Sequence, residues 1–123
     1  MTKSENLIFS ITGPIRVDIR PLAYAVEVTA DLLFHNHIHI DDIRVMEDIY
    51  SRVAKAFHSN PHSIARKIAR ISHLVWDAFT EDTMEIYLGK RLYIFDSPKE
   101  LLIYLAYYYE YSEPFYKVLS YSF

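Results

Sequence analysis

The chain has 123 residues, of which 51% are hydrophobic, with a formal net charge of −3 and no cysteine. This length and apolar content exclude a disordered chain and predict a single domain over residues 1–123. The absence of cysteine excludes disulfides and thiolate chemistry. The N-terminus lacks a signal-peptide pattern and the apolar segments are too short to span a bilayer, so we expect a cytoplasmic protein without a membrane partner.

The first twenty residues do not favour one type of structure. Residues 6–12 fit either a short helix or a strand, and Gly13-Pro14 then interrupts the chain. Apolar and charged residues alternate after this break with the period of a strand, the apolar ones being Ile15, Val17 and Ile19.

Two helices are predicted before residue 58. The first runs from Pro21 to Phe34, because proline is tolerated in a first turn. The second begins at Asp41 or Asp42, whose carboxylates suit the positive end of a helix, and ends at Phe57. Residues spaced three or four apart give each helix a buried face, namely Leu22, Val26, Thr29 and Leu33 in the first and Met46, Ile49, Val53 and Phe57 in the second.

A tight turn at residues 58–60 leads into a third helix. Asn60 is a good N-cap and Pro61 a good first residue, so this helix is predicted over residues 61–78. Its core face repeats at Ile64, Ile68, Ile71 and Val75, while the opposite face carries Ser63, Arg66, Lys67 and Arg70, extended by His62. Two helices joined in this way form a helix-turn-helix, whose second helix enters the major groove of DNA.

Positive charge is concentrated in this part of the chain. Residues 51–76 contain five basic side chains and no acid, a net charge of +5, whereas the remaining residues sum to −8. A basic patch on an acidic body is typical of a nucleic-acid-binding protein.

The C-terminal third is predicted to add a short acidic helix over Thr80–Leu88, ended by Gly89, and a last helix begun by Ser97-Pro98. The complete prediction is an all-α fold of about five to six helices around the helix-turn-helix. A β-hairpin over residues 87–95, touching the minor groove as a wing, is the alternative for the segment between these two helices.

The segment Tyr50–Trp76 resembles the C-terminal effector domain of the master response regulator of bacterial sporulation initiation. The likeness rests on IYSRVAKAF, the turn, SIARKIARISHLVW, the break at Gly89 and the Ser-Pro-Lys-Glu start of the last helix, and it covers roughly residues 20–110. It implies an all-α domain of about six helices that binds DNA. In that family a phosphorylatable receiver domain precedes the effector domain. Here the chain is expected to begin with the effector domain, so that any regulation acts by another route.

The family's DNA-reading residues are matched in part. Arg66 stands where the family keeps a base-reading arginine. Ala65 replaces a glutamate, Ser63 and Ala69 replace arginines, and Arg70 replaces a histidine. The resemblance therefore supports the fold more strongly than it supports the family's particular DNA sequence.

From these features we predict a sequence-specific DNA-binding transcription regulator related to sporulation control, with double-stranded DNA as its partner. Arg66 and Arg70 are expected to reach base edges, with His62 or Ser63 at the start of the helix. The predicted phosphate contacts come from Arg52, Lys55 and Lys67. The competing interpretation is an ordinary solvated helix face.

We predict no metal, no cofactor and no enzymatic activity. His35, His37 and His39 alternate and would share one side of a strand, but a loop between two helices does not preorganise a metal site. The sequence offers no nucleophile–base pair. The clustered acids fit helix starts and helix-dipole partners better than catalysis, at Asp41, Asp42, Glu81, Asp82 and Glu85.

The C-terminal aromatic residues leave two interpretations open. Tyrosine is favoured at interfaces, so these residues form a surface for a homodimer or a protein partner, or else they fold back onto their own domain. In the first case the protein is a degenerate effector domain that acts as a protein–protein interaction module. The residues concerned are Tyr104, Tyr107, Tyr108, Tyr111, Phe115, Tyr116, Tyr121 and Phe123.

Overall fold

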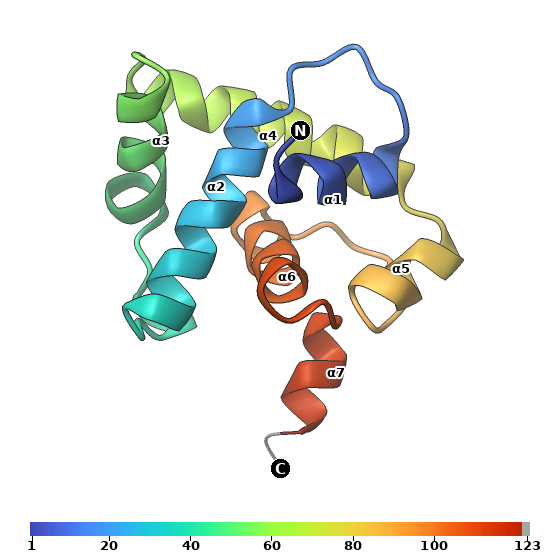
Figure 1. The fold of residues 1–123 in the computed structure, drawn as a ribbon. Helices are drawn as coiled ribbons and strands as arrows, with labels where there is room; N and C mark the ends of the chain where they lie inside the picture. Colours follow the sequence, from blue (N-terminus) through green and yellow to red (C-terminus); the bar gives the residue numbers. More distant parts are fainter. Residues whose placement is uncertain (122–123) are drawn as a thin grey trace.

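The computed structural model describes residues 1–121, in which every regular element is a helix and no strand occurs, and this confirms the all-α prediction (Figure 1). Phe123 of the aromatic tail lies outside the described residues. The α-helices are α1 (Lys3–Thr12), α2 (Arg20–Ala30), α3 (Ser51–Ala56), α4 (Pro61–Ala78), α5 (Glu81–Tyr87), α6 (Pro98–Tyr111) and α7 (Phe115–Ser120). Three shorter elements complete the fold, the π-helical η1 (Asp31–His35) and η3 (Val45–Tyr50) and the 3-10 turn η2 (Ile40–Asp42).

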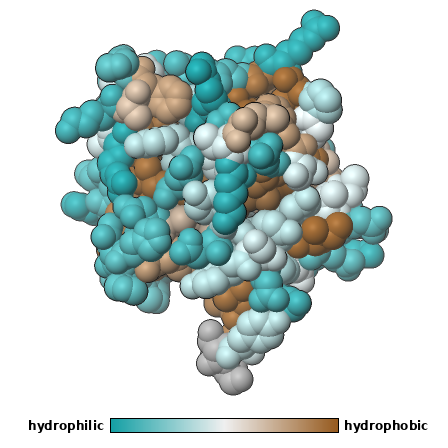
Figure 2. All heavy atoms as spheres, viewed as in Figure 1, coloured by the Kyte–Doolittle hydropathy of each residue, from teal (hydrophilic) through white to brown (hydrophobic). Residues whose placement is uncertain are grey.

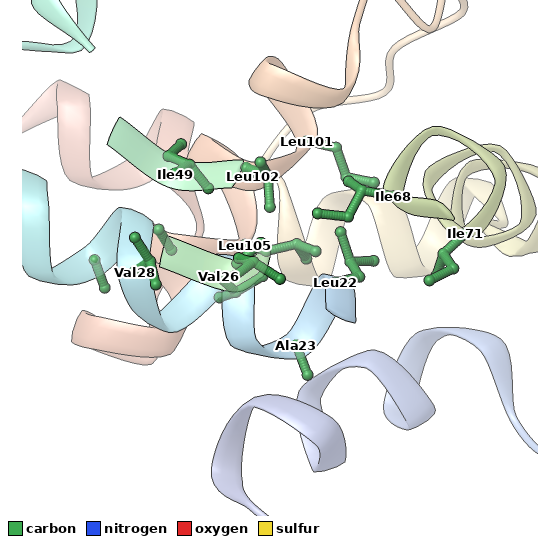
Figure 3. Packing of buried hydrophobic residues seen from close by; sticks show 14 of the residues in the cluster. Leu22, Ala23, Val26, Val28, Ile49, Ile68, Ile71, Leu101, Leu102 and Leu105 are labelled. Carbon is green, nitrogen blue, oxygen red and sulfur yellow. The ribbon is translucent and has the colours of Figure 1, made fainter. Parts of the chain in front are cut away.

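Helices α2 and α6 form the centre of the molecule and pack more extensively on each other than any other pair. Leu22 and Val26 of α2 point toward Leu102 and Leu105 of α6, and Ile68 of α4 closes the same cluster (Figure 3). All five side chains are shielded from solvent, and each buried leucine or isoleucine contributes about 1.5–3 kcal/mol to folding. Helices α1, α3 and α4 then surround this pair.

The helix predicted from Pro21 to Phe34 is present as α2 followed directly by η1. Its first free N–H group, on Arg20, is satisfied by Asp18 Oδ1 at 3.1 Å. At the other end the turns widen, since the Asn36 N–H donates to the carbonyl of Asp31, five residues earlier, at 2.9 Å. The predicted apolar face is confirmed, because Leu22, Val26, Thr29 and Leu33 are all buried.

The strand-like alternation between residues 15 and 19 does not produce a strand. This segment is a loop that connects α1 to α2 over the top of the molecule (Figure 1). Ile19 is buried, whereas Ile15 and Val17 are half-buried against the core. The alternation therefore arises because the apolar residues of the loop point toward the core while the charged residues between them point to solvent. It does not indicate pairing with a neighbouring strand.

The predicted helix start at Asp41 or Asp42 is wrong. Both acids belong to the 3-10 turn η2, and the long helix begins at Val45, as η3 continued by α3. Its first turn is closed by Asp48, whose Oδ2 accepts the Arg44 N–H at 2.8 Å. Asp48, which lies inside the helix, therefore does what an N-cap side chain before the helix usually does. In the predicted apolar stripe Ile49 and Val53 are buried, while the two end residues, Met46 and Phe57, are half-buried.

The hairpin considered for residues 87–95 is also wrong. Tyr87 is the last residue of α5, and the chain from Gly89 to α6 contains no strand. Phe95 instead packs on α4, with its ring 4.7 Å from that of His73 and 5.4 Å from that of Trp76. This anchor holds the connection against α4 by side-chain contacts, without a ladder of backbone hydrogen bonds.

Helix α7 docks where α5 ends. The Tyr116 N–H donates to the Leu88 carbonyl at 3.1 Å. Gly89 has φ +87°, and a Cβ at this position would lie 3.2 Å from Pro114 Cβ. The glycine break that was predicted to end α5 therefore also permits close approach of the C-terminal helix. The Ser97 cap of α6 is confirmed, since its Oγ accepts the Glu100 N–H at 3.4 Å.

The surface has no single continuous apolar face in the view of Figure 2, where hydrophobic patches are separated by hydrophilic side chains. Within residues 1–121, no helix combines the length and the apolar character that a membrane crossing requires. The exposed large hydrophobic residues are Met1, Leu74, Ile86, Tyr93, Ile94, Tyr111 and Tyr121.

Two wholly buried serines differ in their hydrogen bonding and predict opposite mutational effects. Ser4 donates to Glu27 Oε2 at 2.7 Å, whereas the Ser72 hydroxyl has no partner among the described residues. Ser72→Ala is expected to raise the free energy of unfolding by up to about 1 kcal/mol, because it removes an unpaired buried hydroxyl from a helix. Ser4→Ala is expected to lower it by about 1–3 kcal/mol. Urea unfolding of both variants measures this difference, and a loss of stability in Ser72→Ala would contradict the assignment.

Candidate nucleic-acid interface

The turn between α3 and α4 is held by two C-terminal hydrogen bonds of α3. The Ser59 N–H donates to the Ala54 carbonyl at 2.9 Å and the His58 N–H to the Lys55 carbonyl at 3.5 Å. His58 adopts φ +52°, the left-handed conformation that this pairing requires. Asn60 Oδ1 then accepts the Ser63 N–H at 2.9 Å and starts α4. The predicted turn, cap and bounds of residues 61–78 are confirmed.

The inner face of α4 fixes the helix on the body of the protein. Its predicted stripe is confirmed, since Ile64, Ile68, Ile71 and Val75 are only 0–2% exposed. These residues pack α4 against α1, α2, α3 and α6. Rotation of the helix about its axis would expose the stripe, so the residues on its outer face are fixed as well.

The outer face of α4 presents its basic residues to solvent. Arg66, Lys67 and Arg70 are exposed, as is His62, whereas Ser63 is half-buried. The Arg66 guanidinium donates to Ser63 Oγ at 3.4 Å, which turns it toward the start of the helix. None of the ion pairs within residues 1–121 involves the three basic side chains.

Two further basic residues that the sequence interpretation missed lie beside Lys67 and Arg70. Arg16 and Arg20 line the same hollow, which has a volume of about 480 Å³. The Arg20 guanidinium donates two hydrogen bonds to the Asp18 carboxylate, of 2.9 and 2.8 Å. These bonds lower the pKa of Asp18, and the charge of Lys67 adds in the same direction. The only sequence clue was the pair of arginines preceding Pro21, and their position next to α4 depends on how α2 packs.

The two predicted contact residues on α3 differ in their surroundings. Arg52 donates from both terminal nitrogens to Asp31 Oδ2 at 3.2 Å, so its charge is compensated within the protein. Hydrogen bonds from His35 and then from Arg52 lower the pKa of Asp31. Lys55 is exposed and takes part in none of the ion pairs of the described chain. Both basic residues border a hollow of about 370 Å³ that also includes Pro61 at the start of α4.

The far end of α4 is bordered by acidic residues. Asp77 is exposed in its last turn, and α5 follows with Glu81 and Glu85. Arg91 pairs with both glutamates, at 3.3 and 3.2 Å, and leaves little positive charge there. The N-terminal half of α4 is therefore the part suited to a polyanion.

The three alternating histidines do not share one side of an element. His35 lies between Asp31 and Glu110, at 3.0 and 3.5 Å, while His39 accepts the Asp41 N–H at 3.1 Å. His37 has a positive φ of 55° in the loop between them. Across residues 1–121, no three histidine, aspartate or glutamate side chains gather as a metal site would require.

Most of the C-terminal aromatic residues fold back onto the domain. The Tyr104 and Tyr116 hydroxyls lie 3.3 Å apart, and the Phe115 ring packs 5.2 Å from Tyr104 and 4.8 Å from Tyr107. Tyr111 and Tyr121 remain 48% and 63% exposed. Of the two interpretations of this region, folding back accounts for most of its rings.

Comparisons of the chain with protein-family models, with curated proteins and with solved structures found no match. The resemblance to sporulation effector domains therefore stays a prediction from sequence.

The buried tyrosines predict a loss of stability at high pH. Burial raises the pKa of Tyr50 to about 12 and also raises the pKa values of Tyr104, Tyr107 and Tyr109. Above about pH 10 the unfolded chain loses phenolic protons that the folded chain keeps. The free energy of unfolding is therefore expected to be fully retained below that pH and to fall as the pH rises.

Urea unfolding on both sides of pH 10 measures this fall. Tyr50→Phe should make it less steep, because one raised pKa is removed. Tyr93→Phe is the control, since Tyr93 is 85% exposed, and it should leave the slope unchanged. An unchanged slope in Tyr50→Phe would contradict the assignment.

Proposed function

We propose that the protein is a transcription regulator that binds double-stranded DNA with α4. The observation that carries the proposal is the capped helix-turn-helix whose second helix exposes Arg66, Lys67 and Arg70 without acidic partners. Arg66 and Lys67 lie in the first half of α4 and Arg70 directly follows it, and the N-terminal part of such a helix is the part that approaches the base edges in the major groove. Figure 1 shows α3 and the start of α4 meeting at one corner of the molecule, where DNA can approach.

The proposed contacts divide between bases and phosphates. Arg66 and Arg70 are assigned to base edges, where a bidentate arginine discriminates guanine by about 1–3 kcal/mol. His62 and Ser63 are assigned to the helix start. Phosphate contacts are assigned to Lys67, and to Lys55 and Arg52 on α3. Arg52 must exchange its bond with Asp31 for a phosphate, which is feasible because exposed ion pairs contribute only about 0–1 kcal/mol.

The wider setting rests on the sequence resemblance. It supports a bacterial regulator related to sporulation control that works in the cytoplasm, where its DNA is found. We assign the protein a binding role and no catalytic activity. Of the clustered acids, Glu81 and Glu85 are paired with Arg91.

Selection of bound duplexes from a random DNA pool, followed by affinity measurements at several salt concentrations, tests the proposal. Arg66→Ala is expected to weaken binding to the selected site by about 1–3 kcal/mol, roughly 5- to 150-fold, and to relax the preference at one base pair. Lys67→Gln is expected to weaken all duplexes alike and to reduce the salt slope by about one unit.

Arg91→Ala is the matched control, because this arginine is paired with acids beyond the far end of α4. It is expected to bind DNA as the unmodified protein does. An affinity that is independent of salt, or full binding by Arg66→Ala, would overturn the DNA proposal.

A second candidate is protein–protein interaction through the C-terminal surface. It is favoured by exposed Tyr111 and by the hollow of about 530 Å³ that Tyr111 lines with Phe34, Ile38 and Leu119. Under this proposal the protein self-associates at high concentration, and Tyr111→Ser weakens the assembly about tenfold. Sedimentation equilibrium measures this effect. A monomer at every concentration, together with tight DNA binding, would exclude the self-association.

A further inference from the structure

The hollow of about 480 Å³ beside α4 is built by segments distant in sequence. The loop before α2 contributes Arg16 and Val17, α2 contributes Arg20 and Pro21, and Phe57 comes from the end of α3. The remaining wall is one side of α4, with Ile64, Lys67, Arg70 and Ile71. Its volume falls within the range of about 300–1,000 Å³ that is typical of small-molecule sites.

The rim of the hollow is strongly positive. Arg16, Arg20, Lys67 and Arg70 surround it, and the only acid in its lining is Asp18. Asp18 is already held by Arg20 at 2.8 Å. Three cationic side chains are left without an acidic partner in the described chain, on two separate segments that face one space.

The floor of the hollow is apolar. Ile64 and Ile71 are buried parts of the core, and Phe57 and Val17 are half-buried beside them. Phe57 is held from behind by Tyr24, whose ring lies 6.1 Å away in an edge-on arrangement. A rigid apolar floor below a cationic rim matches a molecule with an apolar body and an anionic end. A DNA backbone would use only the rim.

We propose that this hollow binds a small organic anion, with its carboxylate against Arg16, Lys67 and Arg70 and its apolar body on Phe57 and Ile71. Lys67 and Arg70 also belong to the surface assigned to DNA, so the regulatory part of this inference rests on the proposed function. An anion that occupies them competes with DNA, and by thermodynamic linkage DNA weakens the anion by the same factor. The ligand thus acts as an effector that releases the protein from DNA.

Titration of the full chain with 4-phenylbutyrate, followed by amide NMR shifts and calorimetry, tests the site without DNA. Saturable binding is expected, with the largest shifts in the loop before α2 and along residues 64–71. The neutral analogue 4-phenylbutanol tests the cationic rim and inorganic phosphate tests the apolar floor. Both are expected to bind at least about tenfold more weakly than the carboxylate.

Arg16→Ala is the diagnostic variant, because Arg16 is an exposed loop residue that lines the hollow and to which no DNA contact is assigned. It is expected to weaken 4-phenylbutyrate about tenfold or more while DNA affinity changes little. Arg44→Ala is the matched control, since Arg44 is exposed, pairs with Asp48 and does not line the hollow. It should bind the carboxylate normally.

The outcomes separate the two proposals. Absence of saturable 4-phenylbutyrate binding, equal affinity for the alcohol, or full binding by Arg16→Ala would overturn the pocket, whatever DNA does. Carboxylate binding without any DNA binding would retain the pocket and overturn the transcription role. Where both bind, 4-phenylbutyrate is expected to lower DNA affinity more in the unmodified protein than in Arg16→Ala at the same ligand concentration. An unchanged DNA affinity at saturating ligand would overturn the competition.

Discussion

The burial of one side of α4 is the constraint on which the proposed surfaces depend. Ile64, Ile68, Ile71 and Val75 are locked against the α2–α6 centre, and this contact sets the rotation of the helix. Successive residues of an α-helix are about 100° apart, so fixing four buried positions fixes all the others. Arg66 consequently faces away from the core, while Lys67 leans toward the loop before α2 and joins the hollow. The packing of uncharged residues on the inner face of α4 therefore decides where the charged residues of its outer face lie.

The helix-turn-helix was predictable because the sequence features that define it are local. The Asn60 cap, Pro61 and the apolar stripe all act within a few residues of the helix that they define, and the bounds of α4 follow from them. The misassigned loop before α2 depended on distant contacts. The sequence of this loop has the alternating pattern of a strand because its apolar residues pack against the core. The start of the long second helix was missed for another reason, since a local but unusual contact decides it: Asp48, inside the helix, accepts the Arg44 N–H and closes the first turn at Val45, whereas Asp41 and Asp42 belong to a separate 3-10 turn.

The candidate site was predictable for the same reason only on α4 itself. Four of the seven predicted residues, His62, Arg66, Lys67 and Arg70, are exposed along the expected face. The ion pair of Arg52 could not be predicted from the sequence, because its partner Asp31 is twenty-one positions away. Arg16 and Arg20 were visible as charges, yet their approach to Lys67 follows from the packing of α2 on α4. Sequence periodicity identifies the face of a helix, and tertiary packing decides which other segments border it.

The two proposed ligands of α4 differ in what they require from the same cations. A DNA backbone is a line of charges and needs several exposed cations, which Arg66, Lys67 and Arg70 provide on α4. A small carboxylate with an apolar body needs several cations beside an apolar floor, which the side of α4 facing Arg16 provides. Lys67 and Arg70 lie where these two environments meet. Because the same charges would serve both anions, we expect binding of either proposed ligand to weaken binding of the other.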